Sequence, residues 1–191
     1  MNETTILGIA AGAAVIVLLI LVWAWGRRHD WLLRLEGART RRTLRRLGRE
    51  YMEDVVVPDG LDSSITVDFL VLLPGGILVV DLKDYPGVLF AGERIDQWTQ
   101  TVGRRSYKFP NPIAPNQFKV QAVSGQVPEV PVYGRVVFTR RGRFATALPW
   151  SVSTVDSLAE DVADLREGEE VPGSYYSAWL RLRRALEGQE G

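Results

Sequence analysis

Two apolar, β-branched stretches separated by a turn motif constrain this chain more than any other feature. Residues 65–73 (ITVDFLVLL) and 77–83 (ILVVDLK) flank the sequence Pro74-Gly75-Gly76. This composition is typical of two strands joined in a hairpin. We therefore expect a largely apolar sheet with this hairpin at its centre.

The register of the hairpin decides which polar side chains meet. If Leu73 and Gly76 close a tight antiparallel turn, Asp68 lies opposite Asp81. A three-residue turn would instead shift the register by one and place Asp68 against Leu82.

Asp81 and Lys83 are two residues apart and project from the same face of a strand. Like charges across a ladder are destabilising, and a buried carboxylate needs a cation to offset its loss of water. Two sources of positive charge remain open. One is the Lys83 ammonium, which would be purely structural, and the other is a hard divalent ion such as Mg²⁺ held by Asp68 and Asp81.

Composition excludes several other kinds of site. The 191 residues contain no cysteine and a single histidine, His29. Disulfides, thiol nucleophiles and thiolate metal centres are therefore impossible, and a Ser/His/Asp triad is strongly disfavoured. The length suits one domain with a modest appendage.

The N-terminal part predicts a membrane anchor. The 23 residues between Glu3 and Arg27 carry no charge, which is long enough for a helix to cross the hydrocarbon core. We expect a transmembrane helix at residues 5–26, an external tail at 1–4 and a basic juxtamembrane connector at 27–35. Basic residues stay on the cytoplasmic side, so the domain is expected to be cytoplasmic, on a single-pass protein of the cell membrane.

Two further partners follow from this part of the chain. Gly8 and Gly12 form a GxxxG motif that would allow a homodimer, although such spacings are common in membrane helices without a partner. The stretch Arg27–Tyr51 has helical periodicity, and its arginines up to Arg46 either contact phosphates, of nucleic acid or of anionic lipid, or form a solvated face.

The remaining sequence alternates strand and helix patterns. Short strands are predicted at 88–90, 98–102, 104–107 and 132–139, and helices at 112–124, 154–166 and 174–186. Four basic residues beside the first strands would contact a nucleic-acid backbone or simply form surface charge: Arg94, Arg104, Arg105 and Lys108.

The hairpin resembles the core of the nuclease-related domain (NERD) family. The resemblance lies in VDFLV at 67–71 and GGILVVDLKDYPG at 75–87, and it continues through Trp98, FPNPIAPNQ at 109–117 and VVFT at 136–139. It covers residues 36–165, which leaves 166–191 as a C-terminal helix and a disordered end.

The resemblance implies a restriction-endonuclease-like α/β core of the PD-(D/E)xK type, a mixed sheet flanked by helices. It assigns Asp68 and Asp81 as Mg²⁺ ligands, Lys83 as the third catalytic residue and Gln117 as a residue that steadies the site. The implied activity is Mg²⁺-dependent hydrolysis or processing of nucleic acid.

One departure from the family pattern keeps a second function open. The family usually carries a Gly-Glu pair on its first helix, and the corresponding step here is Gly37-Ala38. The alternative is a catalytically inactive, membrane-tethered adaptor that binds nucleic acid, anionic lipid or protein through its basic faces.

Overall fold

The computed structural model describes residues 22, 37–60, 63–168 and 170–188. Contacts divide the chain into two units, Met1–Arg41 and Arg42–Gly191. Within the described ranges, no helix is long and apolar enough to cross a membrane. The predicted span at 5–26 lies outside these ranges except for Val22, and so do Gly8, Gly12 and the connector at 27–35.

A five-stranded mixed sheet forms the centre of the second unit. Its order is β1-β2-β3-β7-β9; β1, β2 and β3 are antiparallel, whereas β3, β7 and β9 run parallel. The strands span Glu50–Pro58 (β1), Ser64–Leu73 (β2), Gly76–Lys83 (β3), Val132–Phe138 (β7) and Val152–Thr154 (β9).

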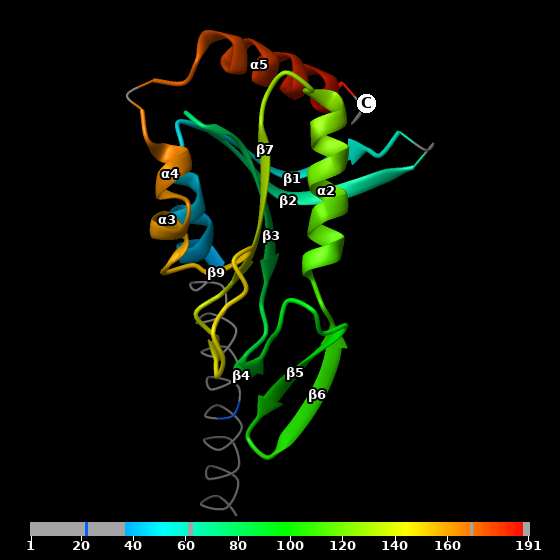
Figure 1. Cartoon of the computed structure of the whole chain (residues 1–191), viewed down its shortest axis with the longest axis vertical. Coiled ribbons are helices and arrows are strands. Elements are labelled where there is room, and N and C mark those ends of the chain that lie inside the picture. The colour runs from blue at the N-terminus through cyan, green and yellow to red at the C-terminus, as the bar shows by residue number, and fades with distance from the viewer. Residues whose placement is uncertain (1–21, 23–36, 61–62, 169, 189–191) are drawn as a thin grey trace, which may run out of the picture. The chain divides into compact units, whose positions relative to one another are not determined.

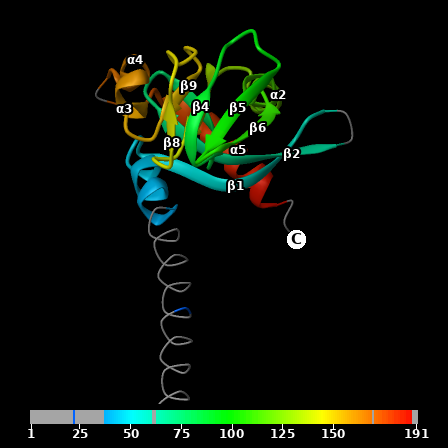
Figure 2. The same ribbon diagram turned by 90° about the horizontal axis from the view of Figure 1, so that it is seen from below.

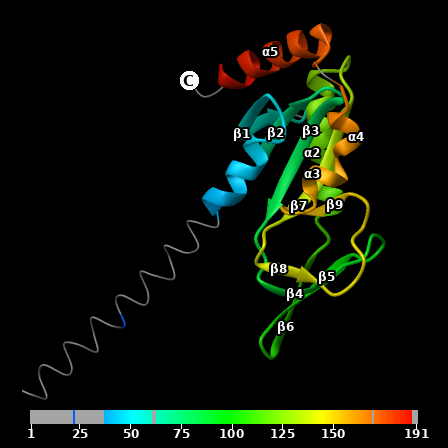
Figure 3. The same cartoon turned by 90° about the vertical axis from the view of Figure 1, so that its left-hand side faces the viewer.

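A smaller four-stranded sheet begins shortly after the end of β3 (Figure 1, Figure 3). Its order is β6-β5-β4-β8, with β4 and β8 parallel and the other pairs antiparallel. The strands are β4 (Gly87–Phe90), β5 (Gln97–Val102), β6 (Arg105–Pro110) and β8 (Gly142–Phe144).

Helices cover both faces of the five-stranded sheet (Figure 1). On one face, α2 (Ile113–Gln126) and α5 (Gly173–Glu187) contribute to a core with the side chains of β1, β2 and β3. On the other, α3 (Leu158–Asp161) and α4 (Ala163–Arg166) pack with Leu44, Leu47 and the opposite side of the strands. The predicted mixed α/β architecture with flanking helices is confirmed.

The hairpin has the tight turn. Leu73 pairs with Gly76, and the same register continues to Phe69 and Val80, which rules out the three-residue turn. Gly76 has a φ of +145°, and a Cβ there would lie 2.3 Å from the carbonyl oxygen of Pro131. Glycine is therefore required at this position.

The pleat of β2 is interrupted at Asp68. Val67 belongs to the core on the α2 face, whereas Phe69 belongs to the core on the α3 face, although residues two apart normally share a face. The ladder to β3 ends at Phe69. On the neighbouring strand β1, Asp54 has a left-handed φ of +52°. The backbone at Asp68 therefore departs from the regular alternation of a β-strand.

Several predicted element boundaries differ from the structure. The helical residues end at 45 rather than at Tyr51, and β1 begins at Glu50. Gly48 lies so close to β2 that a Cβ would be 2.4 Å from the carbonyl oxygen of Leu72, so the chain turns there against the sheet. Helix α2 continues through Gly125, and the helix expected at 154–166 is divided at Val162 into α3 and α4.

Helix α2 approaches β7 closely at Gly134. A Cβ on Gly134 would lie 2.3 Å from Asn116 Oδ1 and 2.7 Å from Val120 Cγ2. Since no side chain fits in this space, glycine sets the distance between the helix and the sheet.

Substitution of Gly134 tests this contact. We expect Gly134→Ala to lower the free energy of unfolding by about 1–3 kcal/mol, because α2 must move away from the sheet. The matched control is Gly125→Ala on α2, where nothing lies within 4 Å of an added Cβ. That change should be neutral or raise stability by up to about 1 kcal/mol. Equal effects in urea unfolding would contradict the close-approach explanation.

Candidate functional site

Asp81 lies near the end of β3 with its side chain directed to the α2 face. The residue is only 1% exposed. Lys119 Nζ on α2 donates a hydrogen bond to Asp81 Oδ1 at 2.6 Å, and Lys83 Nζ lies 2.9 Å from Oδ2. Two ammonium groups from different elements therefore neutralise one buried carboxylate.

The side chain of Asp68 forms a hydrogen bond to β3 where the backbone ladder between β2 and β3 has ended. Its Oδ2 accepts a hydrogen bond of 2.6 Å from the backbone N–H of Leu82, beyond the point where the β2–β3 ladder ends. The side chain thus satisfies an amide on β3 that would otherwise lack this acceptor. As a result, both aspartates lie at the same end of the hairpin.

The two carboxyl groups have opposite pKa shifts. Burial raises the pKa of Asp68, and the nearby Asp81 carboxylate raises it further, against the effects of the Leu82 amide and Lys119. Burial also acts on Asp81, but there the close contacts and positive charges of Lys119 and Lys83 outweigh it, so the pKa of Asp81 is lowered. Asp81 is the firmly ionised member of the pair, and ionising Asp68 costs free energy.

The two carboxylates at this position are of the chemical type that binds a hard divalent ion. Asp81 Oδ2 is buried and has no hydrogen-bond partner, although Lys83 is close enough for an ion pair. Two carboxylates with unfavourable mutual charge are the ligands that Mg²⁺ accepts alongside waters. No group of three or more His, Cys, Asp or Glu suited to a metal occurs in the described part of the chain.

The sequence predicted Gln117 as the α2 residue of the site, but the structure brings Lys119 there. Gln117 is exposed. Residues two apart on a helix do not face each other, and it is Lys119 that contacts Asp81, with 13% of its side chain exposed. The signal available in the sequence was helical spacing: Lys119 follows Asn116 by three residues and precedes Val123 by four, so the three share one face of the helix.

The Asn-Pro segment fixes the start of α2. Asn111 Oδ1 accepts a hydrogen bond of 3.0 Å from the backbone N–H of Ile113, and its Nδ2 donates to the carbonyl oxygens of Ile95 and Glu93 at 2.9 and 3.2 Å. Asn111 therefore ties the helix to the loop between β4 and β5. This anchoring helps to hold Lys119 against Asp81.

The four predicted nucleic-acid contacts do not form one cluster on the strands. All four are exposed, with Arg94 before β5, Arg104 in the β5–β6 turn, and Arg105 and Lys108 on β6. Because side chains alternate along a strand, Arg105 and Lys108 project from opposite faces.

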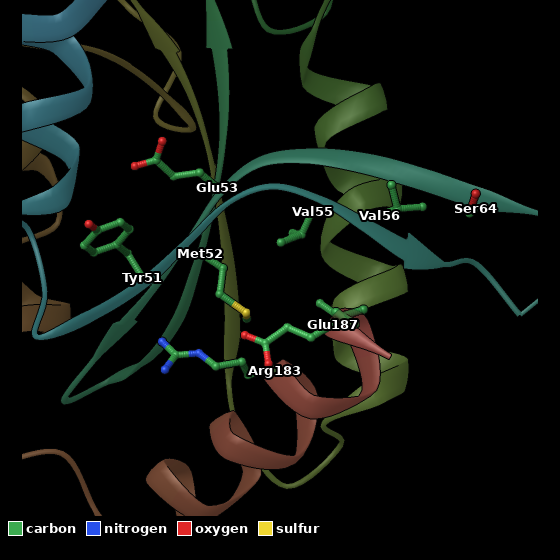
Figure 4. A pocket seen from close by; sticks show the side chains of 9 residues that line it. Tyr51, Met52, Glu53, Val55, Val56, Ser64, Arg183 and Glu187 are labelled. Atoms are coloured by element: carbon green, nitrogen blue, oxygen red, sulfur yellow. The ribbon is translucent and has the colours of Figure 1, made fainter. Parts of the chain in front are cut away.

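A separate cavity of about 580 Å³ lies between β1 and the C-terminal half of α5 (Figure 4). Tyr51 and Met52 line it from the strand, and Arg183 and Glu187 from the helix. Arg183 is paired with Glu50 at 2.7 Å. The lining of this cavity does not include the aspartates.

Comparison with known proteins agrees with the motif assignment. Residues 34–139, more than half of the chain, match the family model described as "Nuclease-related domain". An uncharacterized protein of Bacillus anthracis is 28% identical over 72 residues, which cover 38% of this chain and 34% of that protein. The match thus spans about a third of the relative's length. No solved structure matches significantly.

Neutralising each aspartate in turn should have opposite consequences. Asp81→Asn leaves two ammonium groups without their buried counter-charge, so we expect the free energy of unfolding to fall by about 3 kcal/mol. Asp68→Asn removes a carboxylate that is ionised at a cost and keeps an oxygen for the Leu82 amide. Its stability should equal or exceed that of the wild type. Urea unfolding near neutral pH measures both, and a larger loss for Asp68→Asn would refute this description of the pair.

The contribution of Asp81 should depend on pH. Because the folded-state pKa is lowered, the stabilisation is complete above the unfolded-state pKa of about 3.9 and disappears as the pH falls through the folded-state value. The difference in stability between wild type and Asp81→Asn should therefore shrink toward zero in acid. A difference that stays constant from about pH 7 to about pH 2 would show that the ion pairs are not its source.

Proposed function

Because this chain belongs to the nuclease-related domain family, we propose that it is a phosphodiesterase acting on nucleic acid, with Asp68 and Asp81 as ligands of a divalent cation. The observation that carries the proposal is the joint position of Asp68, Asp81 and Lys83 at one end of the β2–β3 hairpin. The mixed sheet flanked by helices supports a restriction-endonuclease-like core.

Each residue has a distinct role in this proposal. Asp68 and Asp81 would hold the ion, and the ligand atom of Asp81 would be Oδ2, which forms an ion pair with Lys83 but no regular hydrogen bond. When bound, Mg²⁺ would neutralise charge on the phosphate and lower the pKa of its water ligand. Lys83 places a positive charge beside the same carboxylate, where it favours hydroxide over water and attracts the phosphate group.

Lys119 takes the place in the proposed site that the family resemblance gave to Gln117. Its ammonium occupies Asp81 Oδ1, so a cation would share Asp81 with this lysine. We include Lys119 as the residue that keeps Asp81 ionised and oriented, and that offers a second ammonium to phosphate.

One observation favours the non-catalytic adaptor as a second candidate. Lys83 and Lys119 alone already compensate Asp81. The fold would then be retained as a scaffold for binding. Both candidates include the anchor at residues 5–26, for which the apolar sequence is the support.

Plasmid cleavage separates the two functions. We expect the full-length chain in mild detergent to cleave plasmid with Mg²⁺ and to lose activity with EDTA. Asp81→Ala and Lys83→Ala should lower the rate at least about 100-fold. Lys119→Gln should lower it more than Gln117→Ala does, because only Lys119 contacts Asp81.

The control is Gln121→Ala, an exposed change on α2, which should cleave like the wild type. Equal cleavage by every variant would indicate a contaminating nuclease. If no version cleaves while all fold, the adaptor is the correct function.

A further inference from the structure

The four-stranded sheet has one face in the core and one face open to solvent. Leu89, Trp98 and Phe109 belong to a single buried cluster, and the partly buried Phe144 of the fourth strand packs against it. Trp98 is only 1% exposed and packs against Phe138 and Phe109, so it is not available to stack on a base. The residues before and after them along each strand project from the opposite face of the sheet.

The open face carries two cross-strand rows fixed by the register. In one row, Phe90 lies beside Thr99, and Thr99 beside Lys108. The second row runs from Arg143 through Val88 and Thr101 to Ser106. Phe90 is 46% exposed, and Lys108, Ser106 and Arg143 are exposed as well. An exposed aromatic ring thus lies between two cations, with hydroxyl groups around it.

The charges on the open face indicate which class of partner it suits. No acidic residue belongs to either row, and the cations stand on the two outermost strands, about 15 Å apart by strand spacing. The centre of a protein interface is usually depleted of lysine, whereas a polyanion is attracted along its length by separated cations. A base needs a free π-face to stack on an aromatic side chain, and a duplex hides those faces.

We propose that the open face of the β6-β5-β4-β8 sheet binds single-stranded nucleic acid. A base stacks on Phe90, and Lys108 and Arg143 contact different phosphates of the same strand. Seen from below, β4, β5 and β6 lie next to one another (Figure 2). The sheet begins at Gly87, close behind Lys83 in sequence, and lies beyond the end of β3 (Figure 1, Figure 3). A bound strand would therefore lie near the aspartates. The binding itself does not depend on the proposed function, whereas delivery of the bound strand to the aspartates does.

Binding in EDTA tests the face without requiring catalysis. The probe is fluorescein-labelled oligothymidylate DNA of about 12 nucleotides, and anisotropy measures its affinity for the full-length chain in mild detergent. Phe90→Ala should weaken binding at least about fivefold, whereas Phe90→Trp, which keeps a stacking surface, should not. Replacing Lys108 and Arg143 together by glutamine should weaken binding and reduce the salt slope of log K by about 1.4.

The opposite face of the same hairpin supplies the matched control. Tyr107 is 48% exposed and lies beside Gln100, on the face away from Phe90. Tyr107→Ala should bind like the wild type, and thermal unfolding confirms that each variant is folded. The proposal is overturned if Arg105→Gln or Tyr107→Ala loses more affinity than the open-face variants, if a duplex binds as tightly as the single strand, or if the wild type does not bind. Binding without cleavage would reject the proposed activity and leave this inference intact.

Discussion

A carboxylate that is almost completely removed from water must have positive charge within reach, and Asp81 imposes this requirement on the domain. Desolvation costs several kcal/mol for each ion, so both ammonium groups must be held accurately. Lys83 comes with the strand itself, but Lys119 depends on the position of α2. That position is set by the missing side chain of Gly134 and by the hydrogen bonds of Asn111. The electrostatics of one residue and the packing of a whole helix are therefore linked.

Asp68 differs from Asp81 in what its surroundings provide. It has a backbone amide and a more distant lysine, and its neighbour carries the same charge, so the pKa of Asp68 rises while that of Asp81 falls. A positive charge arriving between them would relieve the ionisation cost of Asp68. Opposite pKa shifts in two adjacent carboxyl groups are a common feature of functional sites. It arises here because the pleat of β2 is broken, which lets a side chain replace a ladder bond.

The sequence contained enough information for the hairpin but not for α2. The turn residues limited the register to two alternatives, between which only the pairing of Leu73 with Gly76 decided. The two-residue spacing of Asp81 and Lys83 specified a common face, which was predictable from local geometry. Lys119 was missed because the rotation of a helix against a sheet depends on which residues pack beneath it, such as Asn116 against Gly134. The separation of Arg105 from Lys108 followed from strand alternation, but only once the bounds of β6 were known. Helix α2 passes through Gly125 because tertiary packing outweighs the low helix propensity of glycine.

The charge balance of the site distinguishes this chain from the pattern that its family resemblance implied. Gly37-Ala38 lacks the usual acid, and Lys119 adds a base, so the two aspartates and two lysines sum to zero when all are ionised. A cation approaching a neutral site gains less than one approaching an acidic cluster. In the proposed function, a bound phosphate would change this balance, because its negative charge would attract the ammonium groups away from Asp81 and free carboxylate oxygens. In the proposed function, cation and nucleic acid therefore favour each other's binding, and by linkage the coupling has the same size in both directions.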